Sequence, residues 1–194
     1  MNDLVLREDR DGAVTLTLNR PDKLNALNVP LFKALDDHVA AIEADPSARL
    51  VILRGAGKCF SAGHDLGDIA AGEKLPRPNF QASVIERLAD LPLPVITAVH
   101  GHCYTGALEL ALAGDIIFAS EAARFGDTHA KWALTPVWGL SQRLPRRVGT
   151  YRAREMMFTC RTYGGREAER IGLANICVAN EDYETGLAAL ADSI

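Results

Sequence analysis

The sequence lacks the features that mark several large classes of protein. It has no uninterrupted run of about 18 apolar residues, the length that a membrane-spanning helix needs. Its most apolar segment, residues 107–119, is broken by Glu109, Gly114 and Asp115. The first residues have neither the basic nor the apolar region of a signal peptide. The four cysteines form no C-x-x-C pair, which favours reduced thiols in a cytoplasmic protein.

Basic charge and metal-ligand patterns are also scarce. Lys and Arg number 21 against 25 Asp and Glu, so the formal net charge is −4, whereas nucleic-acid-binding proteins usually carry a basic excess or stripe. His100 and His102 lie one residue apart, but no H-E-x-x-H or carboxylate pattern completes a metal site. We therefore expect no nucleic-acid partner, no membrane association and no metal.

What is present is the composition of one globular domain, with 194 residues of which 48% are hydrophobic. Apolar alternation or short apolar runs predict strands at residues 14–18, 50–54, 94–99 and 116–119. Helical spacing predicts amphipathic helices over residues 32–42, with Asn28 as N-cap, and over residues 80–91. Because strands alternate with helices, the expected fold class is α/β with a largely parallel sheet.

A ten-residue pattern occurs twice, 44 residues apart. Residues 57–66 and 101–110 share a glycine, a cysteine, an aromatic residue, a hydroxyl residue, an acid and a leucine at matching positions, and a predicted strand precedes each copy. We expect each copy to form a tight loop and a helix N-terminus, where backbone N–H groups are unpaired. Two adjacent loops of this kind can aim one N–H each at a single oxygen. The candidates lie around Gly63–His64 and at Gly106. Alternatively, the small residues only permit close packing.

Glu109 lies in the second copy, within the otherwise apolar residues 107–113. A carboxylate buried next to an oxyanion-binding loop is suited to acid–base chemistry. The alternative is a solvent-facing or salt-bridged glutamate.

Further segments carry a resemblance to a known family. They are residues 19–27, 60–66, 101–115, 124–126, 136–144, 147–149 and 167–173. In order and spacing these segments resemble the crotonase, or enoyl-CoA hydratase/isomerase, superfamily. The resemblance implies a spiral of repeated β-β-α units and an acyl-CoA thioester as substrate, with no separate cofactor. It also implies a homotrimer or dimer of trimers.

The resemblance also implies roles for individual residues. The oxyanion donors fall on the backbone N–H groups of His64 and Gly106, and the first catalytic glutamate falls on Glu109. His129 occupies the position of the second glutamate. It is the tentative catalytic partner, with Asp127 as an alternative carboxylate, or else it only lines the pocket. The implied CoA- and substrate-binding residues are Lys23, Leu24, Ala26, Ala62, Asp65, Leu66 and Gly67.

These assignments imply an enoyl-CoA hydratase-like lyase that adds water to a 2-enoyl-CoA through an enolate stabilised by the oxyanion hole. Two alternatives stay open. One is an isomerase or another crotonase-type reaction with a single catalytic glutamate, and the other is a non-catalytic acyl-CoA-binding protein. Members of the resembled family are longer than this chain. We therefore expect a crotonase core at residues 1–190, with residues 191–194 as the start of a truncated C-terminal helical region.

Overall fold

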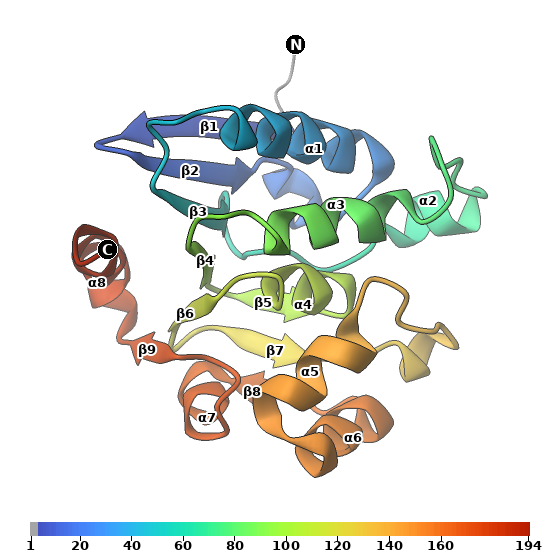
Figure 1. The fold of residues 1–194 in the computed structure, drawn as a ribbon. Helices are drawn as coiled ribbons and strands as arrows, with labels where there is room; N and C mark the ends of the chain where they lie inside the picture. The colour runs from blue at the N-terminus through green and yellow to red at the C-terminus, as the bar shows by residue number, and fades with distance from the viewer. Residues whose placement is uncertain (1–3) are drawn as a thin grey trace.

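The computed structural model describes residues 4–194, in which strands and helices alternate along the chain (Figure 1). The strands are β1 (Val5–Arg10), β2 (Ala13–Leu18), β3 (Leu50–Gly55), β4 (Val95–Val99), β5 (His102–Tyr104), β6 (Ile116–Ser120), β7 (Arg124–Gly126), β8 (Tyr163–Gly164) and β9 (Ile176–Val178). The α-helices are α1 (Val29–Glu43), α2 (Leu66–Ala70), α3 (Phe80–Ala89), α4 (Gly106–Ala111), α5 (Leu140–Val148), α6 (Thr150–Thr159), α7 (Gly165–Arg170) and α8 (Tyr183–Asp192). Three 3₁₀ turns complete the set, η1 (Pro21–Lys23), η2 (Ala130–Trp132) and η3 (Asn180–Asp182).

The strands form two sheets. The larger sheet has the order β1-β2-β3-β4-β6-β9 and is parallel except for the β1–β2 hairpin at its edge, while β5, β7 and β8 form a small second sheet. The prediction of a largely parallel α/β sheet is therefore confirmed. The edge strand β1 and the second sheet were not predicted. The reason is that β1 buries only its first residue, and the strands of the small sheet are two or three residues long, too short for a period.

The larger sheet is covered on both faces. In Figure 1, α1 and α3 lie side by side over one face, and α8 packs on the other. Strand β3 shows the division, because Val51 and Leu53 join the main core whereas Leu50 and Ile52 join the smaller cluster under α8. A strand buried on both faces is a continuous apolar run, which is how this segment appears in the sequence.

Helix α1 begins where the sequence predicts. The Asn28 side chain accepts a hydrogen bond from the Leu31 N–H at 3.1 Å, so it caps the first turn. The helix is also the longest among residues 4–194, and none of the helices there is both long enough and apolar enough to cross a bilayer.

The two copies of the ten-residue pattern run side by side. Ser61 pairs with Cys103 in a parallel bridge, and the N–H groups of Phe60 and Ser61 donate to the carbonyls of His100 and His102 at 2.7 and 2.9 Å. The loop that follows Ser61 therefore adjoins the start of α4. Pairing of the repeat thus brings together two loops that are 44 residues apart in sequence.

Candidate active site

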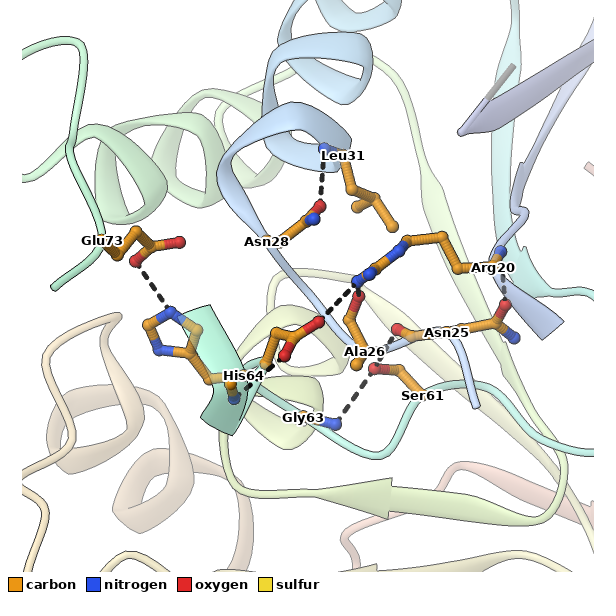
Figure 2. Close-up of polar contacts among 11 residues, drawn as sticks. Arg20, Asn25, Ala26, Asn28, Leu31, Ser61, Gly63, His64 and Glu73 are labelled. Carbon is orange, nitrogen blue, oxygen red and sulfur yellow. Dashed lines mark hydrogen bonds and ion pairs between the residues drawn. The ribbon is translucent and has the colours of Figure 1, made fainter. Parts of the chain in front are cut away.

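The backbone amides of His64 and Gly106 lie close together where the paired loops end. A Cβ placed on Gly106 would lie 3.3 Å from the His64 nitrogen and 2.5 Å from the Trp138 ring, so only glycine fits there. Within residues 4–194 neither amide donates to another protein group. By contrast, the Gly63 N–H donates to Ser61 Oγ at 3.1 Å (Figure 2). The two free amides can therefore bind a single oxygen.

The first of these loops is held by residues from the segment before α1. Asn25 is buried, and its side-chain amide donates to the carbonyls of Ala56 and Cys59, both at 2.8 Å. Ser61 Oγ in turn donates to the Asn25 carbonyl at 2.8 Å (Figure 2). These buried polar groups are therefore satisfied within the protein, and their bonds support the shape of the loop.

The two segments assigned to CoA lie next to each other. The Ala62 N–H donates to the Leu24 carbonyl and the Asp65 N–H donates to the Leu27 carbonyl, each at 2.9 Å. These bonds set residues 23–27 against residues 62–67. Accessible side chains are found on both segments, at Lys23, Leu24 and Leu66. The structure thus places side by side the two segments that the family resemblance implies for this site.

Asp65 differs from the other residues assigned to CoA, because its carboxylate is engaged within the protein. It lies 3.0 Å from Arg20 Nη1 and caps α2 by accepting the Gly67 N–H at 3.1 Å. Arg20 also donates to the Ala26 carbonyl. Burial opposes the charge on Asp65, but the Arg20 guanidinium outweighs it and lowers the pKa of this carboxyl. Arg20 was not predicted, since no local pattern links residues 45 positions apart.

We expect Arg20→Met to lower the free energy of unfolding by about 1–3 kcal/mol, because it leaves the Asp65 carboxylate and the Ala26 carbonyl without their donor. Both side chains of the ion pair are at most 19% exposed, so water compensates only in part. Urea unfolding measures the effect. Arg10→Met is the matched control, since the Arg10–Asp11 pair is at least 85% exposed and should contribute almost nothing. Equal effects in the two variants would contradict the role given to Arg20.

Glu109 on α4 is buried, with 1% of the residue exposed. Its Oε1 accepts two hydrogen bonds, from the Trp138 N–H at 2.8 Å and the Leu140 N–H at 3.1 Å, at the start of α5. The alternative of a solvent-facing glutamate is therefore wrong. These two amides were not predicted as partners. They orient the carboxylate and leave Oε2 free for other contacts.

His129 connects two buried carboxylates. Its Nδ1 lies 2.6 Å from Asp127 Oδ1, which also accepts the His129 N–H at 3.0 Å, and its Nε2 lies 3.5 Å from Glu109 Oε2. No side chain of the three is more than 8% exposed. Burial lowers the pKa of His129, but hydrogen bonding to Asp127 and Glu109 outweighs burial and raises the pKa to about 9. At neutral pH the ring is therefore an imidazolium between two carboxylates.

The raised pKa of His129 predicts that stability falls at alkaline pH. A group whose pKa is higher in the folded state stabilises the fold below its unfolded value, and this contribution is lost as pH rises through the folded value. The pKa of His129 rises from 6.5 to about 9 on folding. We therefore expect the free energy of unfolding to fall by up to about 3 kcal/mol over this range. Urea unfolding at several pH values gives the free energy of unfolding as a function of pH. This free energy should fall less steeply with pH in His129→Gln than in the wild type, and an equal fall would contradict the prediction.

A cavity of about 350 Å³ adjoins the two loops. His64, Thr105, Thr128 and Trp132 are among the residues that line it. The His64 ring packs at 4.6 Å from the ring of Trp138, and Glu73 reaches from the loop between α2 and α3 to within 2.9 Å of His64 Nε2 (Figure 2). Trp132 is half-exposed at the cavity, whereas Trp138 is buried beside His64.

The fold and the site together define a class of protein. Two free amides able to bind an oxyanion, next to a buried cluster of two carboxylates and an imidazolium, are the components of an enzyme that stabilises an oxyanion and moves protons. Residues 8–194 match the family described as enoyl-CoA hydratase/isomerase. The chain belongs to this family, which confirms the crotonase resemblance.

Individual relatives agree with this membership. The chain is 37% identical to a short-chain-enoyl-CoA hydratase of Clostridium acetobutylicum, with all of this chain and 76% of the relative covered. It is 40% identical to the mitochondrial methylglutaconyl-CoA hydratase of Mus musculus, with 87% of this chain and 55% of the relative covered. Among solved structures, an enoyl-CoA hydratase of Mycobacterium tuberculosis H37Rv superposes with a TM-score of 0.86 at 41% identity, covering 98% of this chain and 81% of that chain.

Proposed function

We propose that this protein is an enoyl-CoA hydratase-like lyase that adds water across the double bond of a 2-enoyl-CoA. The observation that carries the proposal is the convergence of two free amides with the Glu109–His129–Asp127 cluster. The hydratases among the relatives support the same reaction. The catalytic alternatives share an enolate of the thioester that the two amides would stabilise, and they differ in how this enolate forms.

In the proposed mechanism, the thioester oxygen binds the amides of His64 and Gly106. Glu109 takes a proton from water as the water oxygen attacks the β-carbon, and negative charge moves onto the thioester oxygen. Two N–H donors stabilise this charge, each typically by a few kcal/mol of barrier. The His129 imidazolium then delivers a proton to the α-carbon, with Asp127 holding the ring.

The 3.5 Å contact between Glu109 Oε2 and His129 Nε2 supports the return step. After one turnover, Glu109 carries the proton taken from water and His129 lacks the one it gave to carbon. Transfer from the carboxyl to the imidazole restores both groups without a proton from bulk water. A charged imidazole can thus take the place of the second carboxyl group that the family pattern predicts.

For the CoA portion of the substrate we propose Lys23, Leu24, Ala26, Ala62, Asp65, Leu66 and Gly67. Their adjacency and the exposure of several of their side chains support contact with the ligand, while Asp65 acts mainly by shaping the loop. We also propose a cytoplasmic homotrimer or dimer of trimers, which the family resemblance supports. Sedimentation of the purified protein tests the assembly.

The proposed reaction is tested with crotonyl-CoA as substrate. Loss of the conjugated enoyl-thioester absorbance, with oxygen from ¹⁸O-labelled water in a 3-hydroxyacyl-CoA product, would support hydration. Conversion of a 3-enoyl-CoA to its 2-enoyl isomer without labelled oxygen, together with no hydration, would overturn hydration in favour of the isomerase. Calorimetric binding of acyl-CoA with no turnover at any chain length would overturn both in favour of a binding protein.

A further inference from the structure

Thr105, the residue before Gly106, has a backbone conformation that is rare for a β-branched residue. Its φ is 56° and its ψ is −113°. Threonine reaches such values only when its surroundings impose them, and residues of this kind gather at functional sites. Thr105 is 8% exposed, so neighbouring residues enclose it almost completely.

Each polar group of Thr105 contacts a segment of the candidate active site. Its N–H donates to the Gly126 carbonyl at 2.9 Å, at the end of β7, and its carbonyl accepts the Glu109 N–H at 3.0 Å in the first turn of α4. Its hydroxyl lies 2.5 Å from the hydroxyl of Thr128, which is the residue between Asp127 and His129. Thr105 is thus hydrogen-bonded to the segment that carries Glu109 and to the segment that carries His129. The peptide bond that follows Thr105 contains the Gly106 N–H.

We propose that the Thr105–Thr128 hydroxyl pair is a positioning device that sets the His129 ring relative to the Gly106 amide. This proposal rests on the proposed function. The amide binds the thioester oxygen and the ring protonates the neighbouring carbon, so both must be correctly placed at the same moment. The hydroxyl pair joins the two loops directly across 23 residues of sequence. Loss of such alignment lowers the rate of the chemical step more than it weakens substrate binding.

The test is a double-mutant cycle with Thr105→Val and Thr128→Val, in which valine keeps the shape and removes the hydroxyl. We expect each single variant to lower kcat about tenfold, with KM within about twofold, and the double variant to be no slower than the worse single variant. Thr105→Ser, which keeps the hydroxyl, should restore most of kcat. Independent, multiplicative losses, or losses confined to KM, would overturn the proposal. Thr128 is not among the residues with positive φ, so its variant carries the test if Thr105→Val fails to fold.

Two further measurements separate positioning from general loss of structure. Thr97→Val removes another buried hydroxyl, one that donates to the Ala111 carbonyl at 2.9 Å, and should lower the melting temperature while leaving kcat within about twofold. In Thr105→Val and Thr128→Val, the alkaline limb of the kcat–pH profile should move toward lower pH, because the His129 ring is no longer held in hydrogen-bonding position between Asp127 and Glu109. An unmoved limb would overturn the proposal.

Failure of this proposal is distinct from failure of the proposed function. If Glu109→Gln abolishes hydration while both valine variants keep wild-type kcat, the hydratase assignment stands and the positioning role is wrong. If the wild type does not hydrate 2-enoyl-CoA, the proposed function itself is wrong, and the pair then positions nothing for this reaction.

Discussion

The Glu109→Gln variant should fold normally and lose at least about a hundredfold of kcat for hydration of 2-enoyl-CoA. Glutamine has the shape of glutamate, and its carbonyl oxygen can still accept the N–H groups of Trp138 and Leu140 that hold Oε1. What disappears is the basic oxygen, Oε2, which we propose takes the proton from water. Steady-state kinetics with crotonyl-CoA measures the loss.

The control for this variant is Glu181→Gln, which makes the same chemical change on an exposed residue and should leave kcat unchanged. Circular dichroism of Glu109→Gln should match that of the wild type. Turnover at the wild-type rate in a correctly folded Glu109→Gln protein would show that Glu109 is not the base and would overturn the mechanism proposed for hydration.

His129→Gln should lower kcat by a comparable factor, about a hundredfold, and should change its pH dependence. A general acid must be protonated to act, and the pKa of His129 is raised to about 9, with burial opposing and the bonds to Asp127 and Glu109 producing the rise. The wild-type kcat should therefore fall as pH rises through about 9, and this alkaline limb should be missing in the variant. Rate profiles at saturating substrate measure both effects.

The competing interpretation, in which His129 only lines the pocket, predicts a different result. The variant would then keep kcat and the alkaline limb and change KM alone. Such a result would remove His129 from the mechanism. A second substitution, His129→Glu, places a third buried carboxylate beside Asp127 and Glu109. If residue 129 takes part in the reaction, we expect the His129→Glu variant to become more active when Asp127→Asn is added, because the second change removes one of the three negative charges.

Several parts of the site follow from local sequence pattern. The repeat indicated two adjacent loops with free amides, because matching residues in two copies imply matching backbone paths. The apolar surroundings of Glu109 indicated its burial. The pattern could not distinguish Gly63 from His64 as donor, because that depends on the Ser61 hydroxyl, which satisfies the Gly63 N–H. The pattern also could not show the Arg20–Asp65 pair, since the sequence around a charged side chain outside helices and strands has no periodicity from which its partner can be predicted.

The sequence by itself thus determined the longer strands of the parallel sheet, helices α1 and α3, the presence of paired small-residue loops and the identity of the residues available for chemistry. These are local properties, because periodicity, caps and composition act within one turn or one strand. Only the tertiary structure decided that Asp127, His129 and Glu109 form one buried cluster and that Thr105 is hydrogen-bonded to both segments that build it. The physical reason is that a titratable group takes its charge state from neighbours a few ångströms away in space. For His129, Asp127 lies two residues away in the same segment, but Glu109 comes from a separate segment that meets it only when the parallel strands β5 and β7 pair.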